Sequence, residues 1–194
     1  INWAIVSGDT VTGYSVIRLA QKMDAGAVLA QSRLAMREME TAGELHDRLA
    51  IDGAALVLRA LADLASGTAD EQAQDEARAT LAPKLTHDAG RIDWYRPAAV
   101  IANQIRGLYP WPGCHVRLVD AAGQQRGQAT LVRARPILEA PGVPGVIDGG
   151  GLVGAGDGAA IQVVEIQPAG RNRMSLTAFR NGHPWEPGMR LESL

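Results

Sequence analysis

The order of apolar and polar residues predicts short mixed elements at the start of the chain. A short apolar run at residues 3–6 predicts a buried strand that leads into the glycine-flanked loop 7–13. Beyond this loop, β-forming residues at 14–19 and an apolar run at 27–34 flank a turn cluster, so we expect a pair of strands. Periodicity alone leaves one alternative open, a single amphipathic helix over residues 16–23.

A long helix is the clearest element of the first half. Thr41 and Glu44 have the spacing of a capping box, in which each side chain accepts a hydrogen bond from the other residue's backbone N–H. Apolar residues then recur at near-helical spacing until Ser66 and Gly67 end the run. The recurring positions are Leu45, Leu49, Ile51, Leu56, Leu61 and Leu64. The pattern therefore predicts a helix that ends near residue 66.

The character of the chain changes at residues 67–82. This stretch has four acidic residues against one arginine, and residues 68–76 contain no large apolar side chain. Such a composition is typical of an exposed linker. We therefore expect a first domain at residues 1–66, of the α/β class, and a second domain at residues 83–194.

The second domain has the pattern of a small β-barrel. Pro97 opens a short helix that ends at Tyr109 and Pro110, with Ile101, Ile105 and Leu108 on one face. Four strand-like runs follow, separated by clusters of Gly, Pro and Asp: residues 114–119, 128–138, 152–155 and 160–167. Several short strands at such spacing favour a barrel.

The distribution of charge bears on the function of the second domain. The net charge is −2, but residues 83–194 carry twelve Lys/Arg against nine Asp/Glu, and eleven of the twelve are arginines. Arginine suits phosphate contacts through its planar fork of donors, although a mixed solvated surface explains the surplus as well. Aromatic residues make up 4% of the chain, too few for a platform that stacks unpaired bases. We expect Trp111 to pack in a core or a domain interface.

Cysteine content and hydropathy indicate the cellular compartment and bear on metal and membrane binding. A single cysteine, Cys114, excludes an internal disulfide and indicates a reducing cytoplasm. No metal-ligand spacing accompanies it, so we expect a buried small residue and no metal site. No apolar run approaches the roughly 20 residues that span a bilayer, so we expect no membrane association. The chain begins with Ile1, and we expect it to be the C-terminal part of a longer protein that is a monomer.

Asp9 is the strongest candidate for chemistry. It lies between Gly8 and the pair Thr12 and Gly13, on a loop where a carboxylate is well placed to act as a base or to orient one. Taken alone, the same residues are also ordinary turn chemistry. The motifs further along the chain decide between the two interpretations.

An ordered set of motifs resembles the methionyl-tRNA formyltransferase family. The set begins with the Asp9 loop and the turn at residues 23–26 and continues to the C-terminus. Its later members are Leu-Ala-Pro-Lys-Leu-Thr at 81–86, Gly-Arg-Ile-Asp-Trp at 90–94, Ile-Arg-Gly-Leu-Tyr-Pro-Trp-Pro-Gly at 105–113 and Glu-Ile-Gln-Pro-Ala-Gly-Arg-Asn-Arg-Met-Ser at 165–175. Each motif is moderately specific, and their order strengthens the match.

The resemblance implies a fold and a reaction. It implies that residues 1–66 are the C-terminal part of a Rossmann-like formyltransferase domain and that residues 83–194 form an OB-like barrel. The implied reaction moves a formyl group from 10-formyltetrahydrofolate to the amino group of methionine on initiator tRNA, with no metal. By motif match Asp9 is the catalytic aspartate, and the catalytic Asn and His lie upstream of Ile1.

The resemblance also assigns binding residues. Gly8, Thr12 and Gly13 are expected to line the folate site. Lys84, Arg171 and Arg173 are expected to contact tRNA phosphates, and for each of them ordinary surface charge is the alternative. Two other functions remain open at this point. One is a nucleic-acid-binding OB-like module without catalysis, and the other is a folate-dependent formyltransferase that acts on a sugar nucleotide.

Overall fold

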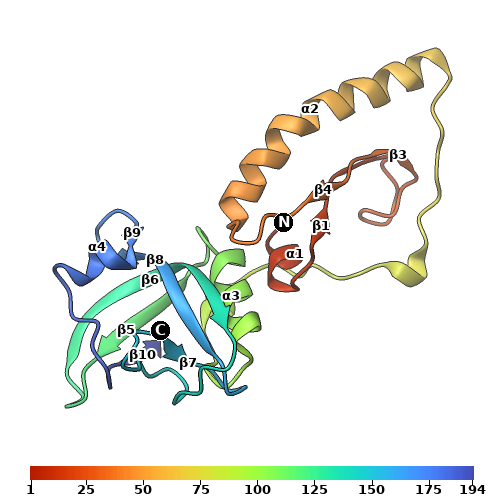
Figure 1. The fold of residues 1–194 in the computed structure, drawn as a ribbon. Helices are drawn as coiled ribbons and strands as arrows, with labels where there is room; N and C mark the ends of the chain where they lie inside the picture. Colours follow the sequence, from red (N-terminus) through yellow and green to blue (C-terminus); the bar gives the residue numbers. More distant parts are fainter. The chain divides into compact units, whose positions relative to one another are not determined.

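A computed structural model describes residues 1–194, which form two compact units (Figure 1). The first unit contains residues 1–8, 38–43 and 84–194, and the second contains residues 9–37 and 44–83. None of the helices is both long enough and apolar enough to cross a membrane.

The chain begins with a helix, α1 (Asn2–Val6), so the strand predicted at residues 3–6 is wrong. A run of four apolar residues is too short for its period to separate a strand from a helix, and packing decides. Here Ile5 is fully buried, and the Asn2 side chain donates a 2.8 Å hydrogen bond to the Gly107 carbonyl at the end of α3 (Ala98–Gly107). The helix is stabilised by its contact with α3.

Helix α3 confirms the prediction of a short helix after Pro97. Ile101, Ile105 and Leu108 are at most 2% exposed and lie in the main hydrophobic core. Each such side chain contributes about 1.5–3 kcal/mol through burial. The α3 helix therefore anchors the first unit by packing on its sheet.

The sheet of the first unit is antiparallel, with strand order β10-β5-β6-β8-β7 and with β9 paired to β8. The strands are β5 (Cys114–Val119), β6 (Gln125–Ile137), β7 (Val153–Gly154), β8 (Ala160–Pro168), β9 (Met174–Ser175) and β10 (Arg190–Ser193). The four predicted strand-like runs correspond to β5, β6, β7 and β8. The sequence pattern missed β9, β10 and the helix α4 (Leu176–Arg180), because all three are too short to show a period.

One loop connects the two outer strands of this sheet. Val146 pairs with Arg190 of β10, and Ile147 pairs with Val153 of β7. The Ile147 N–H donates to the Met189 carbonyl at 2.8 Å, and the Gly154 N–H donates to the Val146 carbonyl at 3.1 Å. Neither outer edge is therefore left wholly unpaired, which removes a site for edge-to-edge association.

The second unit contains two strand pairs. Strand β2 (Ser15–Ile17) pairs with β3 (Val28–Gln31), which confirms the predicted pair and rules out a helix over residues 16–23. Strand β1 (Val11–Thr12) pairs with β4 (Leu34–Ala35).

The long helix α2 (Ala42–Ser66) confirms the other clear prediction for the first half. Its buried face contains Leu45, Leu49, Leu56 and Ala60, each at most 9% exposed. Ile51 and Leu61, which the sequence placed on the same stripe, are 79% and 56% exposed. Their positions are off the i, i+3, i+4 face that the other leucines define.

The segment predicted as a linker is partly paired with the second unit. Gln72 bridges to Val28 of β3, with backbone N···O distances of 2.8 and 3.0 Å. The Gln74 amide donates to the carbonyls of Asp24 and Gly26, at 2.8 and 2.7 Å. The segment continues through the short 3₁₀ helix η1 (Glu76–Arg78). These contacts depend on where strand β3 and the turn before it lie in the fold. The composition of residues 67–82 alone does not predict them.

Trp111 and Cys114 have contrasting surroundings. Trp111 is 50% exposed, so the expectation that it packs in a core is wrong. Its ring and the ring of His87 form a T-shaped pair with centroids 5.7 Å apart. Cys114 is fully buried, as predicted. Burial raises the pKa of the Cys114 thiol to about 12, so this group is a core residue and not a nucleophile.

Candidate functional site

Asp9 lies on an exposed turn that follows α1. The turn is made by Ser7 and Gly8, whose N–H groups donate to the carbonyls of Trp3 and Ile5 at 2.8 and 3.0 Å. Gly8 has a φ of +81°, a conformation that glycine adopts without the cost that a side chain imposes. The glycine therefore ends α1 and presents the next residue, Asp9, to solvent.

A buried arginine supports this turn. A side chain at position 8 would meet the Asn103 amide nitrogen at 3.0 Å. Arg106 fixes the Asn103 side chain, because its Nε and Nη2 donate to Asn103 Oδ1 at 3.2 and 2.8 Å. Arg106 is 8% exposed, and its Nη1 donates to the Glu40 carbonyl at 3.3 Å.

Burial and neighbouring carboxylates shift the pKa of Arg106 in opposite directions. Burial lowers the pKa of its guanidinium, and the carboxylates of Glu40 and Glu38 raise it in part. An arginine keeps its proton in proteins even so. The result is a fixed positive charge beside Asn103.

Thr12 and Gly13 lie together in the second unit. They line a hollow of about 410 Å³ with Arg33 and Arg78. Gly13 permits the closest approach there, because a Cβ at this position would lie 2.1 Å from the Ser32 carbonyl oxygen. The structure thus places two of the three predicted folate-contacting residues in one hollow, whereas Gly8 belongs to the first unit.

The three residues expected to bind tRNA are all exposed. Lys84 precedes the 3₁₀ helix η2 (His87–Gly90), and Arg171 and Arg173 lie in the turn between β8 and β9. Arg171 lines a hollow of about 270 Å³ together with Arg126. Lys84 and Arg173 do not line this hollow, and they do not line the second basic hollow, around Arg135 and Arg180, which is described next.

A second basic hollow, of about 600 Å³, was not foreseen. Arg135 and Arg180 line it, and both are exposed; Glu38 is the one carboxylate in its lining. Arg133 lines it as well, but its Nε pairs with Glu165 at 2.9 Å and its Nη1 donates to the Met39 carbonyl. Arg133 and Arg135 are two residues apart in a predicted strand and therefore share a face, which is the signal that could have found them.

The chemistry of these groups fits two tasks. An exposed carboxylate on a fixed turn can accept or orient a proton. Exposed guanidinium groups around open hollows can bind phosphate oxygens through two parallel hydrogen bonds. No group of three or more His, Cys, Asp or Glu side chains has the arrangement of a metal site.

Comparison with known proteins identifies the relationship. Residues 1–61 match the family described as formyl transferase, and residues 84–184 match the formyl transferase C-terminal domain. The chain is 39% identical to the methionyl-tRNA formyltransferase of Acidobacterium capsulatum, covering 98% of this chain and 61% of that relative. It is 34% identical to the methionyl-tRNA formyltransferase of Bacillus licheniformis, covering 98% of this chain and 60% of that relative.

Solved structures share the fold at low identity. HypX from Aquifex aeolicus, in complex with tetrahydrofolic acid, matches with a TM-score of 0.61 and 22% identity, over 93% of this chain and 32% of HypX. The sugar 3N-formyl transferase WlaRD matches with a TM-score of 0.63 and 13% identity, over 88% of this chain and 59% of WlaRD. The chain spans about three fifths of the length of the curated relatives that it matches. With both parts matched in order, the chain belongs to the formyl transferase family.

Proposed function

We propose that the complete protein transfers a formyl group from 10-formyltetrahydrofolate to the amino group of methionyl-tRNA, in translation initiation. The observation that carries this proposal is the identity to two methionyl-tRNA formyltransferases across nearly the whole chain. The sugar formyltransferase WlaRD shares the fold at 13% identity, which does not favour a sugar substrate.

Asp9 is the proposed catalytic residue of this chain. Formyl transfer removes a proton from the attacking amine, and it develops negative charge on the formyl oxygen. The exposed Asp9 carboxylate accepts that proton, directly or through a water molecule, and orients a protonated partner supplied from outside residues 1–194. The fixed Gly8 turn favours this role, because a base must be held within hydrogen-bond reach of its proton.

The hollow with Thr12 and Gly13 is the proposed contact surface for the folate in this chain. When bound, 10-formyltetrahydrofolate would supply the formyl carbon; the bond from that carbon to the folate nitrogen N10 would break, and tetrahydrofolate would leave with a proton on N10. The residues present fit such a ligand, because Arg33 and Arg78 offer two guanidinium groups that suit the carboxylates of a glutamate tail. Gly8, which belongs to the first unit, remains a separate predicted folate contact.

The first unit is the proposed tRNA-binding part. We propose that Lys84, Arg171 and Arg173 contact phosphates, together with Arg135 and Arg180. The antiparallel sheet, whose outer strands are joined through residues 146–147, supports an OB-like barrel at residues 83–194. The boundary of the two units between residues 83 and 84 supports a second domain that begins there, whereas residues 67–82 belong to the second unit and not to a separate connecting segment.

The test of the catalytic assignment is Asp9→Asn in the complete protein. The change removes the base and keeps the shape, so we expect turnover to fall at least about a hundredfold while tRNA affinity changes little. Single-turnover formylation and a tRNA binding isotherm measure the two effects. The matched control is Asp52→Asn, an exposed aspartate on α2 that forms no ion pair.

The control variant should retain wild-type turnover. A value above a tenth of wild-type turnover for Asp9→Asn would show that Asp9 is a turn residue without a catalytic role.

A further inference from the structure

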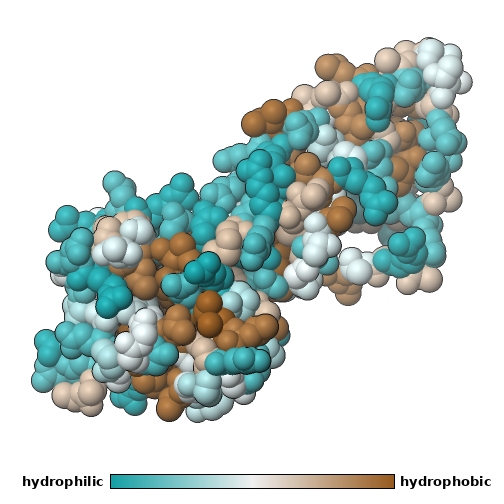
Figure 2. Space-filling model, in the orientation of Figure 1, coloured by the Kyte–Doolittle hydropathy of each residue, from teal (hydrophilic) through white to brown (hydrophobic).

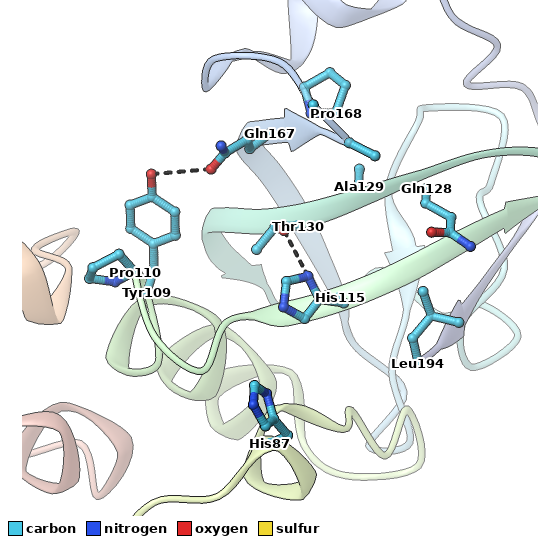
Figure 3. Close-up of a pocket in the computed structure, with 12 residues that line it drawn as sticks. His87, Tyr109, Pro110, His115, Gln128, Ala129, Thr130, Gln167, Pro168 and Leu194 are labelled. Carbon is cyan, nitrogen blue, oxygen red and sulfur yellow. Dashed lines mark hydrogen bonds between the residues drawn. The ribbon is translucent and has the colours of Figure 1, made fainter.

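A neutral hollow lies at one end of strands β5, β6 and β8 (Figure 3). Its volume is about 630 Å³, and its polar side chains are Tyr109, His115, Gln128, Thr130, Gln167 and His87. No Asp, Glu, Lys or Arg side chain lines it, and the rest of its lining includes Leu194, the last residue of the sequence. Burying a charge without a partner is costly, so the hollow suits an uncharged ligand.

The polar groups of the hollow have fixed orientations. His115 Nε2 donates to the Pro112 carbonyl at 3.0 Å, since a carbonyl only accepts, and Thr130 Oγ1 lies 2.8 Å from His115 Nδ1. The Tyr109 hydroxyl donates to Gln167 Oε1 at 3.4 Å, and Gln167 Nε2 donates to the Arg171 carbonyl at 3.0 Å. In Figure 3 one dashed line joins Tyr109 to Gln167, and a second joins Thr130 to His115.

Gln128 differs from these groups. Its side chain is exposed and forms no hydrogen bond with the protein, so it offers one acceptor and two donors to a ligand. A glutamine presented in this way matches the paired donor and acceptor on the edge of a nucleobase. The ring of Tyr109 and the flat faces of Pro110 and Pro168 supply apolar walls.

A smaller basic hollow adjoins the neutral one. Gln128, Pro168 and Ala169 line both of them. Of its two arginines, Arg126 pairs with Asp120 at 2.7 Å, whereas Arg171 forms no ion pair. A neutral hollow beside an available guanidinium has the layout of a base site next to a phosphate site.

We propose that the neutral hollow binds one unpaired nucleobase of the bound RNA, with its edge on Gln128 and a neighbouring phosphate on Arg171. This inference rests on the proposed function, which makes RNA a substrate. It also revises the expectation drawn from aromatic content, because a site for one base needs one accessible ring, here the half-buried Tyr109, and not a platform.

The test uses residues 1–194 and two fluorescein-labelled RNAs, a ten-nucleotide oligoadenylate and a blunt RNA duplex of ten base pairs, which has no unpaired base. We expect Gln128→Met and Tyr109→Leu each to weaken oligoadenylate binding about tenfold, the scale for losing one stacked or paired base. Duplex affinity and the slope of log affinity against log salt should stay unchanged, because neither residue contacts a phosphate. Arg171→Ala should instead reduce that slope by about one.

Gln125→Met is the matched control, since Gln125 is an exposed glutamine of the same strand outside the hollow. Circular dichroism checks that each variant folds. If Tyr109→Leu unfolds, Gln128→Met alone tests the base site, because Gln128 is exposed and its substitution should not disturb the fold. Oligoadenylate binding that is unchanged in Gln128→Met, or lowered equally in Gln125→Met, overturns the base site alone. A wild-type chain that binds neither RNA at low salt overturns the proposed RNA substrate together with the base site.

Discussion

Arg106, Asp9 and Cys114 differ in burial and in charge, and these two properties decide what each side chain can do. Arg106 is buried and charged, and its hydrogen bonds to Asn103 and to the Glu40 carbonyl compensate for the lost hydration. Asp9 is exposed and charged, which leaves its carboxylate available to a substrate. Cys114 is buried and neutral, with no polar partner that would stabilise a thiolate.

The buried thiol predicts a pH dependence of stability. In the unfolded chain Cys114 ionises near pH 9, whereas in the folded chain burial raises its pKa to about 12. Above pH 9 the unfolded state therefore gains charge that the folded state cannot, and stability falls as pH rises toward 12. The slope from this one group should approach about 1.4 kcal/mol per pH unit.

Urea denaturation of the wild type and Cys114→Ala between pH 8 and 11 measures this effect. The difference in unfolding free energy between the two proteins should shrink as pH rises. A difference that is independent of pH would mean that the thiol is not shielded from water in solution.

At the scale of elements, α2 has two apolar faces. One is buried through Leu45, Leu49 and Leu56. The other contains Ile51 and Leu58, which are 79% and 68% exposed. Figure 2 shows hydrophobic residues at the surface of the region that Figure 1 labels α2. Exposed apolar area of this kind favours association.

The two faces predict opposite responses to substitution. Ile51→Gln combined with Leu58→Gln should change the unfolding free energy by less than about 1 kcal/mol, because surface changes are usually within ±0.5 kcal/mol each. The double variant should also bind less of a hydrophobic dye and self-associate less. Leu45→Ala should cost about 2–5 kcal/mol, because it leaves a cavity under a fully buried side chain.

Denaturation curves and analytical ultracentrifugation at several concentrations report the two quantities. A loss of more than about 2 kcal/mol in the glutamine double variant would show that this second face is covered in solution.

At the scale of the whole molecule, most of the arginines lie in the C-terminal part of the chain. Residues 83–194 carry eleven arginines, and Arg126, Arg135, Arg171 and Arg180 line two basic hollows. Phosphate contacts release condensed counterions from RNA, so binding through such groups weakens as salt rises.

The arginines predict a change in salt dependence without a change in stability. Arg171→Ala combined with Arg173→Ala should lower the slope of log affinity against log salt by roughly one to two, measured with a tRNA transcript. Arg135→Ala combined with Arg180→Ala should act in the same direction. All four side chains are exposed, so the melting temperature should stay nearly constant.

Arg59→Ala is the matched control, because Arg59 is an exposed arginine on α2 in the other unit. Affinity that does not depend on salt, or a double variant that unfolds, would mean that these arginines have structural roles only.

The sequence by itself determined the elements whose signals are local. The period of Leu45, Leu49 and Leu56 specified the buried face of α2, and Pro97 specified the start of α3. Strand-like runs between clusters of Gly, Pro and Asp specified β5 to β8. Asp9 and the ordered motifs were also readable, because a motif is a local property. These features can be predicted from sequence because each depends only on residues a few positions away along the chain.

Only the tertiary structure decided the features that join distant residues. Residues 3–6 became a helix because Ile5 and Asn2 pack on α3, about a hundred residues away. The hollow around Gln128 and the basic hollow with Arg135 and Arg180 each combine side chains from several separate elements. Such sites depend on strand register and loop packing, which free energy determines over the whole unit and which no single stretch of sequence encodes.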